Sequence, residues 1–181
     1  MEKGKITSVN LSGTHSMQKQ QKERINLLKG LGVEGDAHMG KKIKHRSRVA
    51  KDPDKPNLRQ VHLIQNELHD ELSLKGFTVG PGQMGENITT SGIELTTLPE
   101  DTVLKIGPNA QIQVKGLRSP CHQLNGVEEG LLKAVTVRHE SGSAILKWGI
   151  MGIVKEGGEI QAGDEIAVEF PEGPHRMLDK V

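Results

Sequence analysis

Short segments rich in strand-compatible apolar residues, separated by glycine, proline and asparagine, recur along most of the chain. This pattern predicts β-strands with turns between them. Many short strands spaced in this way favour a β-barrel over a doubly wound sheet. The predicted strands cover residues 6–11, 59–64, 88–90, 93–98, 103–106, 110–114, 150–154 and 166–170.

Helical spacing predicts only a few short helices. Asn66 can cap one helix that carries Leu68 and Leu72 on one face, and a second helical pattern covers residues 128–137. The stretch 17–28 is ambiguous and could form a polar helix that the following glycines end.

The whole chain, residues 1–181, fits one domain with a core at about 5–170. Residues 32–40 are rich in glycine and should be largely loop, with backbone that adopts unusual φ values or approaches a neighbour closely. We expect residues 40–57 to form an exposed insertion, because prolines and polar residues break any regular structure there. The polar tail, 171–181, is expected to be frayed.

Composition places the chain among cytoplasmic, water-soluble proteins. Charged residues make up 26% and apolar residues 34% of it, and no apolar run approaches the roughly 20 residues that cross a bilayer. The first residues lead into no apolar segment of a signal peptide. A single cysteine cannot form an intrachain disulfide, which agrees with a reducing compartment.

Charge is unevenly distributed along the chain. Residues 1–60 hold 14 Lys and Arg against 6 Asp and Glu, and six of those cations lie within 41–51. Such a basic run attracts phosphate or another anion, although it can equally be a solvated loop. Nucleic acid is not expected as a partner, because one tryptophan, two phenylalanines and no tyrosine leave little for bases to stack on.

The only cysteine, Cys121, lies in the segment Arg118-Ser119-Pro120-Cys121-His122. Pro120 disfavours helix before it, so the thiol should begin a new segment after a strand. Positive charge from Arg118 and His122 would favour a thiolate that acts as nucleophile, sulfur carrier or metal ligand. The alternative is a small buried hydrophobic residue, since free cysteine is often buried.

Three polar clusters could converge with this thiol. Each also has a structural explanation, namely capping a turn, pairing with a surface carboxylate or satisfying loop backbone. The clusters are Asp36 with His38, Arg59 with Gln60, and Glu86 with Asn87.

Two other kinds of site have weaker support. Zinc could use Cys121, His38, His45 and His62, but no compact Cys/His spacing favours it. Glycines at 80, 82 and 85 match the spacing G-x-G-x-x-G, yet strands follow them instead of the helix that a dinucleotide-binding loop requires.

Taken in order, the clusters resemble those of the MOSC family, the carboxy-terminal domain of molybdenum cofactor sulfurases, which also occurs as small stand-alone bacterial proteins. The resemblance covers roughly residues 5 to 170 and implies a mostly β fold with helical excursions (β/α+β), a barrel like the β-barrel domain of pyruvate kinase. The matching motifs are Gly32-Val33-Glu34-Gly35-Asp36-Ala37-His38, Arg59-Gln60-Val61-His62-Leu63-Ile64, Gly82-Gln83-Met84-Gly85-Glu86-Asn87-Ile88, Arg118-Ser119-Pro120-Cys121 and Gly163-Asp164.

The resemblance also implies a cofactor, the molybdenum cofactor (molybdopterin), with Cys121 carrying sulfur or ligating molybdenum. Arg59 and Arg118 would hold its phosphate through charge-assisted bonds. The activity implied is sulfur transfer or reduction of N-hydroxylated compounds. The pterin and pocket residues implied are Asp36, His38, Gln60, Glu86, Asn87 and Asn125.

Two features differ from the fused sulfurases and their relatives. This chain holds no pyridoxal-phosphate domain, so sulfur or electrons would come from a separate cysteine desulfurase or reductase. The basic run 41–51 stands where many relatives have a shorter loop, so His45 is not carried over as a site residue.

Two functions of other classes also agree with these residues. One is a cysteine-dependent hydrolase or transferase with His122 or His38 as base, which lacks a recognisable oxyanion loop. The other is a non-catalytic barrel that binds a small anion or a partner protein.

Overall fold

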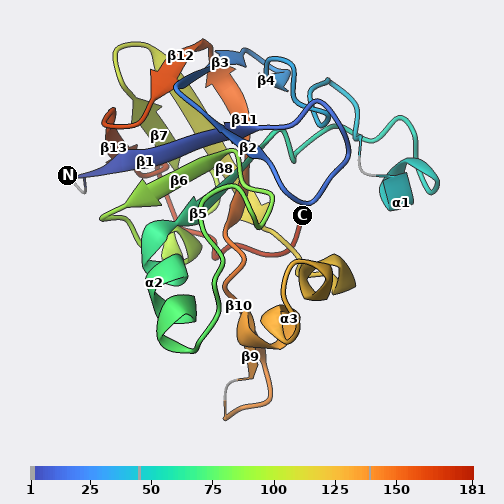
Figure 1. Ribbon diagram of the computed structural model, residues 1–181. Coiled ribbons are helices and arrows are strands. Elements are labelled where there is room, and N and C mark those ends of the chain that lie inside the picture. Colours follow the sequence, from blue (N-terminus) through green and yellow to red (C-terminus); the bar gives the residue numbers. More distant parts are fainter. Residues whose placement is uncertain (1–2, 45, 139) are drawn as a thin grey trace.

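The computed structural model describes residues 3–44, 46–138 and 140–181, and its main feature is a closed barrel of β-strands (Figure 1). Around the ring the strands follow the order β13-β7-β8-β11-β5-β6-β1, and β1 pairs with β13 to close it. The predicted mostly β barrel is confirmed. Its strands are β1 (Lys3–Leu11), β5 (Val61–Gln65), β6 (Ile88–Ser91), β7 (Val103–Ile106), β8 (Ala110–Leu117), β11 (Ile150–Glu156) and β13 (Glu165–Glu169).

Neighbouring barrel strands are antiparallel except for β5 and β6, which are parallel. A parallel pair needs a long crossover, and here helix α2 (Asn66–Leu74) and the glycine turn, residues 80–87, supply it. The predicted helix is present, but Asn66 is its first residue instead of its cap: Gln65 takes the cap position and no side chain caps the helix. The crossover carries the glycine turn back beside β5, where the backbone N–H of Asn87 donates to the carbonyl of His62.

Two hydrophobic clusters stabilise the fold. The first fills the barrel with side chains that alternate along the strands, as in β8, where Ala110, Ile112 and Val114 are buried and their neighbours are not. The second lies between α2 and the chain after Cys121, and its largest member is Trp148. The candidate site lies where this second cluster meets the barrel.

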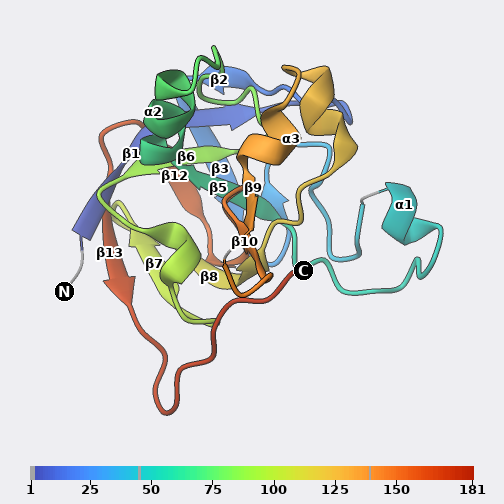
Figure 2. The same ribbon diagram turned by 90° about the horizontal axis from the view of Figure 1, so that it is seen from below.

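The remaining elements lie outside the closed ring of the barrel. Strand β2 pairs with β1 in antiparallel orientation. A three-stranded sheet of order β12-β3-β4 flanks the barrel, and β9 and β10 form a separate ribbon. Helices α2 and α3 and this ribbon lie at one end of the barrel (Figures 1 and 2). These elements are β2 (Gln20–Lys22), β3 (Arg24–Leu28), β4 (Gly32–Val33), β9 (Thr136–Arg138), β10 (Ala144–Leu146), β12 (Gly158–Gln161), α1 (Arg46–Val49), α3 (Leu131–Ala134) and the 3₁₀ turns η1 (Leu95–Thr97) and η2 (His122–Gly126).

The polar helix considered for residues 17–28 is wrong. The segment forms β2 and β3, and Ile25 and Leu27 point into the core while the residues between them are more exposed. Period-two burial of this kind belongs to a strand, and pairing of β3 with β12 and β4 outweighs the weak helical propensity.

Two other element predictions are corrected. Residues 93–98 contain the 3₁₀ turn η1 instead of a strand, because Leu95 and Leu98 are three residues apart and both are buried. The helix predicted for 128–137 is shortened to α3, after which the chain enters β9.

Most described residues of the insertion, 40–57, are exposed or half-buried, and α1 stands away from the barrel in both ribbon views. The tail, 171–181, is docked instead of frayed. Leu178 packs against the barrel core, and the backbone of Asp179 and Val181 bonds to Leu117 of β8. The tail is mostly polar, so its sequence did not indicate that Leu178 packs against the core.

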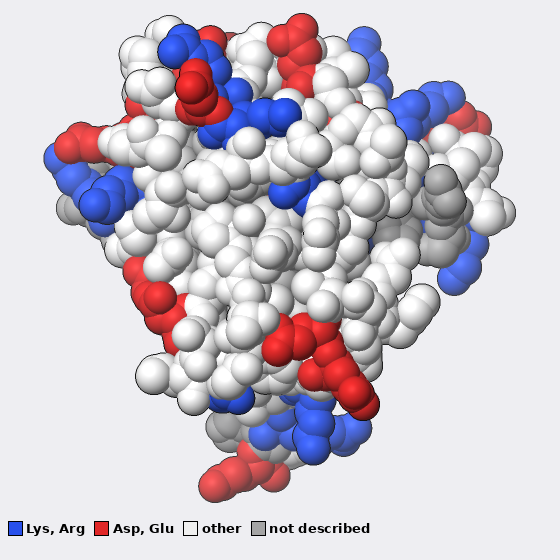
Figure 3. Space-filling model, in the orientation of Figure 1, with Lys and Arg blue, Asp and Glu red and all other residues white. Residues whose placement is uncertain are grey.

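Within the three described segments, no helix is long and apolar enough to span a membrane. Figure 3 shows that on one face the cations and anions gather in small groups near the edge, around a largely uncharged centre. The described residues on this face form no continuous basic surface of the kind that follows nucleic acid phosphates.

Candidate functional site

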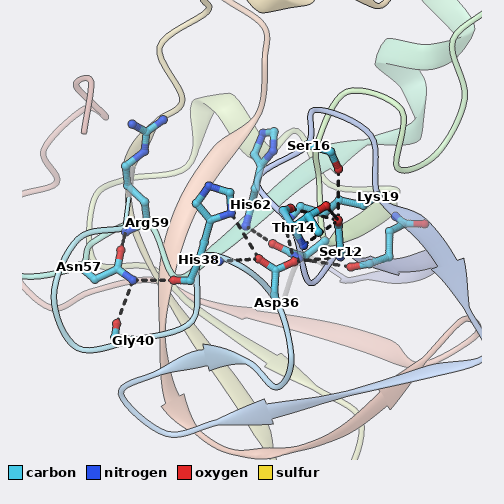
Figure 4. A network of polar contacts seen from close by, with 12 residues as sticks. Ser12, Thr14, Ser16, Lys19, Asp36, His38, Gly40, Asn57, Arg59 and His62 are labelled. Atoms are coloured by element: carbon cyan, nitrogen blue, oxygen red, sulfur yellow. Dashed lines mark hydrogen bonds and ion pairs between the residues drawn. The ribbon is translucent and has the colours of Figure 1, made fainter. Parts of the chain in front are cut away.

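Asp36 is the centre of a buried hydrogen-bond network that gathers residues from distant parts of the chain (Figure 4). Its Oδ2 accepts from Lys19 Nζ at 2.6 Å, from Asn87 Nδ2 at 3.0 Å and from the backbone N–H of Ser12 at 3.3 Å. Its Oδ1 accepts from the backbone N–H of His38 at 3.0 Å and from the ring Nδ1 at 3.3 Å.

The charge on Asp36 is stabilised within the protein. Burial opposes ionisation, but hydrogen bonds from His38 and the charge of Lys19 outweigh it and hold the pKa of this carboxyl below its usual range. A carboxylate offers about four lone-pair sites, and the five donors occupy them. Asp36 therefore organises its neighbours, and its contact with a pterin stays a prediction.

His38 is oriented by this carboxylate. An ionised Asp36 can only accept, so the ring Nδ1 carries the proton and Nε2 is left free. His15 contacts the same ring edge to face, with centroids 5.1 Å apart. Burial is the main reason that the pKa of His38 is lowered, which makes its ring neutral at neutral pH.

Lys19 belongs to this network and was not found from the sequence. Its side chain is buried against Asp36, and its backbone N–H donates to the carbonyl of Gly82 in the glycine turn. Burial lowers the pKa of the lysine, although the charge of Asp36 opposes this. One lysine in a polar segment gives no sequence signal, because its importance depends on contacts with residues 17 and 63 positions away.

Arg59 and Arg118 are two buried guanidinium groups, each less than 10% exposed. The guanidinium of Arg118 lies over the ring of Trp148, 4.3 Å from its centroid, and its Nε has no hydrogen-bond partner within residues 3–44, 46–138 and 140–181. Burial and the charge of Arg118 lower the pKa of Arg59 to about 9, and burial lowers that of Arg118 to about 10. Among the residues described, no carboxylate pairs with either side chain.

Cys121 follows Arg118 after the break at Pro120, in extended backbone immediately before η2. Its thiol is half-buried, packs against the second hydrophobic cluster and donates to Gln123 Oε1 at 3.6 Å. The charged form of Cys121 favours the charged forms of Arg59 and Arg118, whose pKa values it raises against the effect of burial. The thiol therefore lies at a partly exposed position, within electrostatic range of both guanidiniums, instead of deep in the core.

A hollow of about 100 Å³ opens between these elements. Two cationic side chains and two imidazoles, those of His15 and His38, surround it, so its chemistry suits a small anion. It is lined in part by Met17, Lys19, His38, Gly85, Arg118 and Gln123.

The sequence profile of the MOSC domain matches residues 37–167, most of the chain and most of these site residues. The chain belongs to the MOSC domain family. This family is associated with binding of the molybdenum cofactor. A search among functionally curated proteins gave no significant match.

Solved structures share the fold of this MOSC domain. The YuaD protein from Bacillus subtilis is 28% identical and superposes with a TM-score of 0.76, covering 94% of this chain and 97% of its own. YiiM from Geobacillus stearothermophilus is 17% identical, with a TM-score of 0.64 over 92% of this chain and 75% of its own. YiiM from Escherichia coli is 20% identical, with a TM-score of 0.61 over 95% of this chain and 73% of its own.

Gln60 and Asn87 hold the backbone of the MOSC barrel together. Gln60 donates to the carbonyl of Gly30 and accepts from the N–H of Val154, both at 3.0 Å. Asn87 accepts from the N–H of His62 at 3.2 Å and donates to Asp36. Their amides are used within the protein, which agrees with the structural explanation for these two residues.

Glu86 is fully buried beneath the glycine turn. Its Oε1 accepts from the backbone N–H of Gly82 at 2.7 Å and lies 3.5 Å from His69 Nε2, whereas its Oε2 has no partner. Burial raises the pKa of Glu86 to about 7 despite hydrogen bonds that favour its charge. It supports the turn from below instead of lining the hollow.

Asn125 lies apart from the other predicted residues. Its Oδ1 accepts from the N–H of Leu132 at 3.0 Å, and it lines a separate surface hollow with Pro120 and Lys133. The structure thus gives it a role at the start of α3, and its contact with a pterin stays a prediction.

The zinc alternative gains no support from the described residues, among which no three His, Cys, Asp or Glu are arranged to hold a metal ion. His62 is fully buried, with Nε2 2.8 Å from the carbonyl of Trp148. His45 lies outside the described residues.

Proposed function

We propose that this MOSC domain binds the molybdenum cofactor. In this proposal Arg59 and Arg118 hold the cofactor's phosphate, and Cys121 carries sulfur or ligates molybdenum. The single observation that carries the proposal is the pair of buried guanidinium groups, within electrostatic range of the thiol, to which no described carboxylate is paired.

The physical argument starts from the cost of burying charge. An unpaired buried cation is unfavourable unless an anion and hydrogen bonds offset the lost solvation. Among the described residues, the Nε of Arg118 has no hydrogen-bond partner, and Asp36 is saturated by other donors. A phosphate would supply charge and acceptors to both planar guanidiniums at little entropic cost.

The thiol supports the same proposal. Cysteine sulfur is a soft ligand and an acceptor of sulfur, and Cys121 is partly exposed within electrostatic range of the two arginines. When bound, the cofactor would supply a molybdenum centre for sulfur transfer or for reduction of N-hydroxylated compounds. We further propose that a separate desulfurase or reductase delivers the sulfur or the electrons.

The hollow offers groups that suit two parts of the cofactor. It opens to solvent and admits a phosphate-sized group beside Lys19 and Arg118. For the pterin, Gln123 offers an amide and His38 offers a ring nitrogen.

The basic insertion is a weaker candidate for the phosphate site. Lys41, Lys42 and Lys44 are exposed, and Lys42 is already paired with Asp54. Exposed lysines act as screened point charges and would influence the rate of encounter more than the residence time.

The test is to produce the protein in cells that make the cofactor and to measure bound molybdenum and pterin by metal analysis and mass spectrometry. Arg59→Ala or Arg118→Ala should each weaken binding by about 1.5 to 3 kcal/mol, roughly ten- to a hundred-fold. The matched control replaces Lys41, Lys42 and Lys44 together by alanine and should lose less. The proposal fails if the wild type binds no cofactor, and the arginine clamp fails if the triple lysine variant loses more.

A further inference from the structure

We propose that anion binding in the hollow lined by Lys19, His38 and Arg118 is coupled to protonation of His38, so that the ring takes up one proton when a small oxyanion binds. The inference rests on the proposed anion site and adds a proton donor to it. It follows from how the ring is held and from which charges face it.

The first step is the fixed orientation of the ring. Asp36 accepts from both the backbone N–H and the Nδ1–H of His38, so the ring cannot use Nδ1 for a ligand. Nε2 is the remaining polar atom, on a side chain that lines the hollow and is 21% exposed. In Figure 4 the ring extends from the Asp36 network toward the same side as the side chain of Arg59.

The second step is the set of charges around the ring. Asp36 favours the protonated ring from one side, while Lys19 and Arg118 oppose it across the hollow. His15 contacts the ring edge to face. The charge of Glu86 favours the charged forms of Lys19 and Arg118 and so raises their pKa values. Burial and these two cations together keep the ring neutral while the hollow holds no anion.

The third step is the effect of an anion. An oxyanion between Lys19, Arg118 and His38 would offset the charge of the two cations and offer an acceptor to Nε2–H. Both effects raise the pKa of His38, because each favours the charged ring. By linkage, a ligand that promotes protonation is itself bound more tightly when the ring is protonated.

The consequence is a proton held at the ligand. Solvent supplies the proton to Nε2, and the protonated ring donates a hydrogen bond to the oxyanion while Nδ1–H stays on Asp36. Asp36 acts here as a positioning residue, since it acts on the ligand only through His38. The site would then bind small oxyanions more tightly at mildly acidic pH than at alkaline pH.

The experiment uses sulfate as the probe, because sulfate has no protonation step between pH 5.5 and 8. Titration calorimetry in buffers of different ionisation enthalpy counts the protons taken up with each sulfate. We expect uptake of up to one proton and affinity that rises by up to about tenfold per pH unit as the pH falls. His38→Gln should bind sulfate without this uptake.

Two control variants identify the responsible group. His15→Gln removes the other imidazole at the hollow and should retain the coupling. Glu86→Gln should also retain it, although Glu86 titrates in the same range. Loss of the coupling in either variant, with His38→Gln unchanged, would overturn the assignment to His38.

A direct readout avoids dependence on any variant. Two-dimensional NMR of the imidazole nitrogens of the wild type should show His38 protonated at Nδ1 only, with sulfate shifting its titration to higher pH. If sulfate binds equally at every pH without proton uptake, the coupling is wrong and the anion site stands. If sulfate does not bind the wild type at any pH, both this inference and the proposed anion site are wrong.

Discussion

Asp36 and Lys19 form the ion pair on which the site network depends at the scale of single residues. Asp36→Asn keeps the size of the side chain but removes its charge, which leaves the ammonium of Lys19 buried without an anion. Breaking a buried pair from one side costs about 3 to 5 kcal/mol. We expect a loss near the lower end of this range, measured by urea unfolding at pH 7.

A double-mutant cycle separates the lost pair from other effects of the substitution. In a Lys19→Met background the buried cation is absent, so Asp36→Asn should cost about 1 to 2 kcal/mol less than in the wild type. Equal costs in both backgrounds would contradict the proposed dependence of Lys19 on Asp36.

At the scale of elements, the glycine turn sets the shape of the site wall. Gly82 has a φ of +80°, and a Cβ there would lie 2.5 Å from the carbonyl oxygen of Lys19. Gly82→Ala should therefore destabilise the protein by about 2 to 4 kcal/mol, because backbone strain and a clash with main chain add together.

The control for this substitution lies in the same turn. Gly80 has no left-handed φ, and a Cβ there would meet nothing within 4 Å. Gly80→Ala should change the midpoint of thermal unfolding little. If the two variants melted alike, the close approach of the turn to Lys19 would not matter for stability.

Glu86 should make the stability of this turn depend on pH. Its pKa in the folded protein, about 7, lies above the ordinary value of 4.5, so the folded state binds more protons between these two values. The contribution of Glu86 to stability is therefore fully present below about pH 4.5 and is lost as the pH rises to about 7.

Glu86→Gln tests this sign. The amide cannot titrate, so the stability of the variant relative to the wild type should increase as the pH rises from about 4.5 to about 7. Burial lowers the pKa of His69, and its Nε2 lies 3.5 Å from Glu86, so the comparison is made in a His69→Gln background to remove the coupled titration. A difference that is constant with pH, measured by denaturant unfolding, would show that burial does not perturb Glu86.

At the scale of the whole molecule, the docked tail contributes to the barrel. Leu178 is 9% exposed and packs against the main core, whereas its neighbour Met177 is 77% exposed. Leu178→Ala should cost about 2 kcal/mol, the lower end for burial of a leucine. Met177→Ala is the matched control and should change the free energy of unfolding by less than about 0.5 kcal/mol. Equal effects of the two variants would mean that the tail does not stabilise the fold.

The sequence by itself determined the local and repetitive features of this protein. Apolar segments 103–106, 110–114 and 150–154 predicted strands that lie within β7, β8 and β11. Such strands can be read from the sequence because side chains on opposite faces of a strand alternate from one residue to the next. The order of the motifs also identified the family before any geometry was known. Cys121 with its flanking Arg118 could be recognised because it is the only thiol and follows a proline break.

Only the tertiary structure decided which polar residues line the hollow and which serve the fold. Asp36, Gln60 and Asn87 looked alike in sequence to His38 and Arg59, yet their acceptors and donors are used by backbone and by Lys19. Lys19 lines the hollow and bonds to Asp36, but no sequence pattern predicted it as a site residue. Such roles depend on which donors and acceptors remain free after the barrel closes, and that depends on contacts between residues far apart in the chain.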